Sequence, residues 1–158
     1  GLAGIYLNRK GREGQGILGP TEAAAVAEEL RAGLLALRDP EAPEAAVVRR
    51  VFFPEQVFRG PYREEAPDLL VGFGEGYRIS WGGAVGSLAG PVFSDNLKAW
   101  SGDHCVDPAL VPGLLFSTLP IGAEEPALLD LAPSLLDLFG VDAPERMRGR
   151  KLFAEARA

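Results

Sequence analysis

The residues best suited to chemistry gather in one short stretch, "WSGDHCVDP", residues 100–108. It holds the only histidine and the only cysteine of the chain, His104 and Cys105, with Asp103 and Asp107 close by. A neutral imidazole is a good zinc ligand, and carboxylates suit zinc, manganese or magnesium. A catalytic zinc needs about three protein ligands, however, and this stretch offers a single histidine. Two interpretations therefore stay open at this point: His104 binds a metal, or it hydrogen-bonds within a polar loop.

Two further chemical patterns are weaker. The segment "GQGILG", residues 14–19, matches the glycine-rich fingerprint of dinucleotide sites, but Pro20 removes an amide donor where a phosphate would bind. A Ser–His–Asp triad could be built only through His104, and no serine lies in the G-x-S-x-G pattern of a nucleophile elbow. We therefore interpret residues 14–19 as a plain loop and assign no triad.

Secondary structure must position these residues, and four runs of apolar, β-branched or aromatic residues predict the strands that would do so. The predicted strands cover residues 4–8, 45–53, 68–73 and 113–117. Over residues 77–108 the pattern gives way to Gly, Ser, Asp and Asn, with Trp81 and Trp100. A long stretch without regular structure is often functional. We expect the two tryptophans to pack as anchors of this loop.

Two longer segments predict helices, and "PEQVF" after residue 53 predicts one further turn. The first helix is predicted over residues 20–40, with Pro20 in its first turn, and carries an apolar stripe at helical spacing, Val26, Leu30, Leu34 and Leu37. The second covers residues 130–140, where Asp130 suits the cap, Pro133 the first turn and Gly140 the end. Alternating strands and helices favour an α/β fold, although they are few for a sheet covered on both faces.

Composition narrows the class of protein. A chain of 158 residues suits one domain, residues 1–158, and a net charge of −6 argues against non-specific binding of nucleic acid. No apolar run reaches the roughly 18–20 residues of a membrane helix, and one cysteine allows no internal disulfide. We therefore expect a cytoplasmic protein with no nucleic-acid or membrane partner.

Five segments, taken in order, resemble the C-terminal part of the alkaline phosphatase superfamily, on its type I phosphodiesterase/nucleotide pyrophosphatase side. They are "GIYLNRKGREGQGIL", "APDLLVGFGEGYRISW", "DNLKAWSGDHCVDPALVPGLLFS", "LLDLAPSLLDLFGV" and "MRGRKL". Within that superfamily they are most similar to a branch of predicted phosphohydrolases and phosphomutases. The resemblance implies an α/β sandwich with two divalent metals, usually zinc, and a Thr or Ser nucleophile that attacks phosphorus.

By this resemblance, His104 matches the late histidine that completes a metal site in a loop before a C-terminal strand. An earlier Asp–His pair of the family is a poorer match, because Cys105 replaces the glycine that follows it. The match implies that Asp103 orients the histidine and that Asn96 and Trp100 orient substrate or metal. No residue of the chain is assigned as the nucleophile.

The family's nucleophile and its other metal ligands would precede "GIYLN", so the resemblance implies a C-terminal fragment that is nearly inert alone. Its expected partners are the N-terminal catalytic portion of the same protein and, in that parent enzyme, a small phosphate ester. An exposed strand edge at residues 4–8 or 45–53 would favour self-association. The residues also permit a second class of function, a self-standing binding or scaffold domain whose long loop contacts a partner protein.

Overall fold

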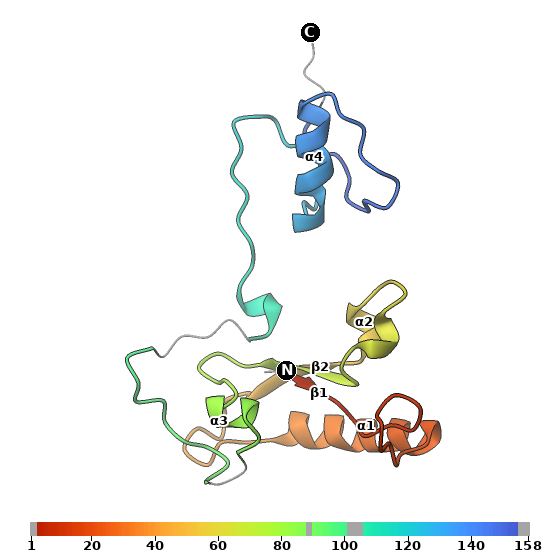
Figure 1. Cartoon of the computed structure of the whole chain (residues 1–158). Helices are drawn as coiled ribbons and strands as arrows, with labels where there is room; N and C mark the ends of the chain where they lie inside the picture. Colours follow the sequence, from red (N-terminus) through yellow and green to blue (C-terminus); the bar gives the residue numbers. More distant parts are fainter. Residues whose placement is uncertain (1–2, 88–89, 101–105, 155–158) are drawn as a thin grey trace. The chain divides into compact units, whose positions relative to one another are not determined.

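The computed structural model describes residues 3–87, 90–100 and 106–154, and the chain forms two compact units (Figure 1). Unit 1 is Gly1–Pro112 and unit 2 is Gly113–Ala158. The described residues form a mixed α/β structure with a small antiparallel sheet and α-helices. None of the helices that they form is both long and apolar enough to cross a membrane.

Unit 1 is built on a three-stranded sheet with the strand order β1-β3-β2. Its strands are β1 (Gly4–Ile5), β2 (Val48–Phe52) and β3 (Leu69–Phe73), and both outer strands run antiparallel to β3. The three corresponding predictions are confirmed, with shorter bounds. Strand β1 ends early because the Leu7 amide donates to the Asp68 carboxylate, at 2.7 Å, instead of to a neighbouring strand. Self-association through a sheet edge stays a prediction.

Helix α1 (Pro20–Ala36) packs against β2 (Figure 1) and closes the apolar core. Its two buried side chains are Ala23 and Ala27, whose small size lets the helix approach the sheet closely. The other buried members of this core are Leu7, Val47, Val48, Val51, Leu69 and Val71. The predicted apolar stripe only borders the core: Val26, Leu34 and Leu37 pack against it, while Leu30 is exposed.

Shorter elements join these parts of unit 1. Helix α2 (Pro54–Val57) confirms the predicted single turn, and helix α3 (Trp81–Ala84) interrupts the long loop that follows β3. Two 3₁₀ turns cover Arg63–Glu65 and Pro108–Leu110.

The prediction of a strand at residues 113–117 is wrong. These residues pair with no strand of the described chain, and the Leu114 and Phe116 side chains are 84% and 89% exposed. An apolar extended segment becomes a strand only where a neighbour satisfies its backbone groups. The local residue pattern favours a strand here, but residues 113–117 do not form one because no neighbouring strand among the described residues pairs with them.

Unit 2 centres on a 3₁₀ turn, Leu128–Asp130, which leads directly into helix α4 (Leu131–Leu138). Pro133 is buried in the first turn and Gly140 follows the end of the helix with a φ of 67°, as the sequence predicts. Asp130 occupies the N-cap position of α4, as the sequence predicts, but its side chain accepts no hydrogen bond from an amide of that helix. Its carboxylate accepts the amides of Ala127 at 2.9 Å and of Arg150 at 2.7 Å, and so ties the chain after the helix to the turn before it.

Candidate functional site

The loop between β3 and the Pro108–Leu110 turn, residues 74–107, carries every site residue predicted from the sequence. His104, Asp103 and the neighbouring Cys105 lie outside the described residues. The two remaining candidates lie side by side, because the Asn96 side-chain amide donates to the Trp100 carbonyl at 3.2 Å. This part of the loop thus brings Asn96 and Trp100 together.

The tryptophans of this loop do not act as packing anchors in the way the sequence predicts. The Trp100 side chain is 88% exposed, so a packing role for it is wrong. Trp81 is half exposed, and the Arg78 guanidinium lies 4.7 Å from the centre of its ring, which is a cation–π contact. Trp100 therefore remains available to a ligand or a partner, whereas Trp81 already contacts Arg78.

The loop is anchored to the sheet directly after the predicted histidine. Val106 forms a parallel bridge with Phe73, the last residue of β3, and the Asp107 amide donates to the Phe73 carbonyl at 3.0 Å. Asp107 itself is fully buried, and its carboxylate also accepts the Ala109 amide at 2.9 Å. The loop therefore starts and ends at the same point, the C-terminal end of β3.

An ion pair between the partly exposed Arg50 side chain and the buried Asp107 carboxylate completes this anchor. The Arg50 guanidinium binds the Asp107 carboxylate with two hydrogen bonds, Nε to Oδ2 at 2.5 Å and Nη2 to Oδ1. Two parallel bonds of this kind fix the orientation as well as the distance of the two groups. Asp107 thus joins three elements. Its carboxylate binds Arg50 of β2 and the Ala109 amide of the turn that follows the loop, and its backbone amide binds β3.

Gly72 makes room for this pair. Arg50 of β2 lies opposite Gly72 of β3 in the sheet register. A Cβ atom at Gly72 would lie 3.2 Å from Asp107 Oδ2 and 3.3 Å from Asp107 Cβ. The arginine therefore reaches the aspartate where β3 has no side chain, which is a common reason for glycine inside a strand.

The electrostatics of the anchor favour a permanently charged pair. The hydrogen bond from Arg50 lowers the pKa of Asp107 to about 2, although burial alone would raise it. The same contact raises the pKa of the Arg50 guanidinium. Asp107 is therefore a carboxylate at neutral pH, with its oxygens already engaged, and serves to hold the loop instead of to carry a proton.

Sequence reasoning noted Asp107 as an acid close to the histidine but missed Arg50 altogether. The available signal was Gly72, an isolated glycine in a predicted strand, which indicates a bulge or a close approach. Nothing in the local pattern shows that the approaching group comes from a residue 57 positions away.

The described residues do not by themselves fit a metal centre. None of their His, Cys, Asp and Glu side chains form a group of three or more that could hold an ion. Asp107, the described carboxylate nearest in sequence to His104, is already bound to Arg50 and the Ala109 amide. We therefore derive no chemical step through a metal from this part of the chain.

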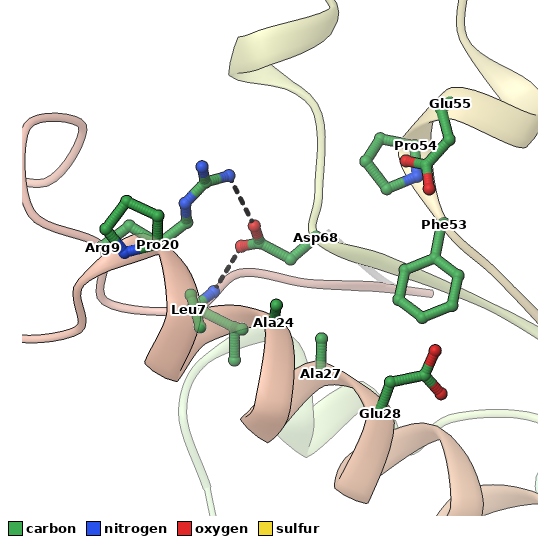
Figure 2. Close-up of a pocket in the computed structure, with 11 residues that line it drawn as sticks. Leu7, Arg9, Pro20, Ala24, Ala27, Glu28, Phe53, Pro54, Glu55 and Asp68 are labelled. Carbon is green, nitrogen blue, oxygen red and sulfur yellow. Dashed lines mark hydrogen bonds and ion pairs between the residues drawn. The ribbon is translucent and has the colours of Figure 1, made fainter.

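A separate pocket of about 420 Å³ lies beside α1 and contains none of the predicted site residues (Figure 2). Ala24, Ala27 and the Phe53 ring line its apolar wall, and Asp68 faces Arg9 across its polar end (Figure 2). Burial would raise the pKa of Asp68, but hydrogen bonds led by Arg12 lower it below its ordinary value. Because this carboxylate is bound to Leu7 and two arginines, we interpret the polar end as structural.

Comparison with known proteins adds no relative to this geometry. No protein-family model, no curated protein and no solved structure matches the chain. The resemblance to phosphohydrolases therefore depends on the five sequence segments alone. The structure contributes a different observation, the anchor that Val106 and Asp107 form at the end of the 74–107 loop.

Proposed function

We propose that this chain is part of a metal-dependent phosphoryl hydrolase or transferase of the phosphodiesterase or nucleotide pyrophosphatase type. In this proposal His104 contributes one metal bond, and the 74–107 loop forms one wall of the active site. The intact enzyme has an alkaline-phosphatase-like α/β sandwich, a small phosphate ester as substrate and two divalent metals, usually zinc. When bound, those metals activate the nucleophile and offset the charge that develops on phosphate oxygens.

The anchor at the end of the loop is the observation that supports this function best. A metal ligand must be held in place, and loops that carry functional residues are usually positioned by a rigid scaffold. The Arg50–Asp107 pair and the bridge at Phe73 provide such a scaffold beginning two residues after His104.

One imidazole is only one of the about three protein ligands that a catalytic zinc needs. The proposal therefore assigns the nucleophile and the other ligands to residues outside this chain. Asp103 would orient the histidine, and Asn96 and Trp100 would contact substrate or metal. The exposed Trp100 ring is compatible with such a contact, because no side chain of the described residues covers it.

The test is turnover of an aryl phosphodiester and an aryl phosphomonoester by the full-length gene product that contains this chain. His104→Ala should lower kcat by about 10²- to 10³-fold, the usual loss for one electrostatic stabiliser of the transition state. Asp103→Asn should cost about 10- to 100-fold, and Cys105→Ser should have almost no effect. Metal content and melting temperature, recorded for each variant, separate a lost ligand from a lost fold.

The anchor provides a matched pair of variants for the same assay. Arg50→Gln breaks the pair with Asp107 and should lower kcat, whereas Arg49→Gln removes the exposed neighbouring charge and should not. Ordinary turnover by this chain alone, abolished in its own His104→Ala variant, would contradict the proposal, since the chain would then hold a complete site.

A second candidate, a self-standing binding or scaffold domain, is favoured by the exposed apolar side chains of the loop. Val85, Val92, Leu97 and Trp100 are each at least 82% exposed. Such residues in one loop are typical of a contact with another protein. Absence of turnover in the metal-loaded full-length gene product, with unchanged metal content in His104→Ala, would favour this candidate over the enzyme.

A further inference from the structure

Unit 2 contains a second concave surface, which none of the residues of the 74–107 loop line. It has a volume of about 330 Å³ and lies between the start of α4 and the segment that returns toward it, residues 146–149. Its lining is mainly apolar, with two arginines: Leu128, Leu129, Ala132, Pro133, Arg146, Met147, Arg148 and Gly149. We call this surface the α4 pocket.

The walls of the α4 pocket are held in place by the backbone. A Cβ atom at Gly149 would lie 2.0 Å from the Leu129 carbonyl oxygen, so the returning segment runs directly against the turn before α4. One residue further on, the Arg150 amide donates to the buried carboxylate of Asp130 at 2.7 Å. Arg146 and Arg148 therefore extend from a segment whose position is fixed.

Arg146 and Arg148 differ from the other cations of this segment. Arg150 donates to the Glu125 carbonyl at 2.8 Å, and Lys151 forms an ion pair with Asp137. Arg146 and Arg148 are exposed and form no hydrogen bond or ion pair in the described chain. The α4 pocket thus combines two unpaired guanidinium groups with leucines that are 84% and 71% exposed, Leu128 and Leu129.

We propose that the α4 pocket binds a small ligand with an apolar body and one carboxylate, of the medium-chain fatty acid class. The exposed leucines and Met147 favour an aliphatic body, because its transfer from water is the main favourable term. The two guanidinium groups favour a carboxylate, with which arginine forms charge-assisted bonds. The volume lies at the lower end of the about 300–1,000 Å³ of small-molecule pockets, which favours a short ligand over a drug-sized one.

The test uses Met147, the only methionine of the chain, as a reporter inside the pocket. Decanoate, below its micelle concentration, is titrated into the full chain with a ¹³C-labelled methionine methyl group. We expect a saturable shift of the Met147 signal. Decanol, which lacks the charge, and acetate, which lacks the body, should each bind at least about tenfold more weakly. Fluorescence of Trp81 and Trp100, which belong to unit 1, should not change.

Variants separate the charge from the shape of the pocket. The double variant Arg146→Gln/Arg148→Gln should weaken decanoate binding about tenfold or more, whereas Lys151→Gln, which removes a cation paired elsewhere, should not. Ala132→Leu should abolish binding by filling the pocket while both arginines remain. Hydrogen exchange of the Leu152 amide confirms in each variant that unit 2 is folded.

Three results would overturn the proposal. The first is decanol that binds as tightly as decanoate, and the second is a double arginine variant that retains full affinity for decanoate, because either result would show that the carboxylate is not recognised. A Met147 signal that is unchanged by decanoate but broadened by vesicles of anionic lipid would assign the surface to a membrane instead.

Discussion

Each of the two units is stabilised internally by a different kind of interaction. Unit 1 buries a cluster of eight apolar side chains between α1 and the sheet. In the described part of unit 2, the buried apolar side chains are Leu152 and Pro133, and the buried polar residues are Asp130 and Ser134. The Ser134 hydroxyl donates to the Asp130 carbonyl at 2.5 Å and accepts the Leu152 amide at 2.8 Å. Unit 2 thus depends on a few directional bonds and unit 1 on buried area.

Both units nevertheless use a buried aspartate to bring the chain back to an earlier element. Asp107 ties the end of the long loop to β2, and Asp130 ties the segment after α4 to the turn before it. Amides of Arg150 and Ala127 lower the pKa of Asp130, while a guanidinium has the main effect on Asp107. The comparison shows that a buried aspartate can add to the stability of an apolar core, as in unit 1, or can be a main source of stability where little apolar area is buried, as in unit 2.

The largest expected effect is therefore in unit 2. Asp130→Ala should unfold unit 2 and leave unit 1 folded, because the amides of Ala127 and Arg150 lose their acceptor and little apolar area compensates. Hydrogen exchange of the Leu152 amide should become fast, while amides of β3 stay protected. Asp142→Ala, which removes an exposed carboxylate that forms no bond within the described residues, is the control and should leave both units protected. Protection of Leu152 that survives in Asp130→Ala would contradict this account.

A single substitution is expected to have a smaller effect on the stability of unit 1, because many apolar contacts contribute to its core. Leu69→Ala should lower the free energy of unfolding by about 2–5 kcal/mol, the usual cost of truncating a fully buried leucine. Urea titration followed by circular dichroism measures this loss. Ile17→Ala, at an exposed position, should change it by less than about 0.5 kcal/mol. Equal losses for the two variants would show that the cluster around Leu69 is not the core.

The smallest effect is the dependence of unit 1 on pH. The pKa of Asp107 is about 2 in the folded chain, below the about 3.9 of an unfolded aspartate. Its stabilisation is therefore complete above about pH 4 and is lost as the pH falls from about 4 to about 2. Asp68, whose folded pKa is also lowered, adds a loss of the same sign.

Unfolding curves of unit 1 at several pH values test this expectation. Asp107→Asn should be less stable than the natural chain at neutral pH and should lose less stability on acidification. Asp142→Asn, an exposed aspartate of unit 2, should keep the natural pH dependence of unit 1. An unchanged acid loss in Asp107→Asn would mean that the pair with Arg50 does not stabilise unit 1.

The sequence by itself determined the elements whose causes are local. Runs of β-branched and aromatic residues predicted β2 and β3, and helix α1, which begins at Pro20, followed from periodicity. Pro133 and Gly140 marked the ends of α4, because proline and glycine restrict the backbone wherever they occur. The rarity of histidine also directed attention to the loop at residues 74–107, and the role of His104 stays a prediction.

Only the tertiary structure decided which groups meet. Arg50 and Asp107 are 57 positions apart, and Asp130 and Arg150 are 20 apart, so no local pattern could pair them. The wrong strand at residues 113–117 has the same origin, because strand formation requires a neighbour that periodicity does not contain. The anchor of the candidate site exists because Gly72 leaves space for a distant arginine, and such a space is a property of the packed chain.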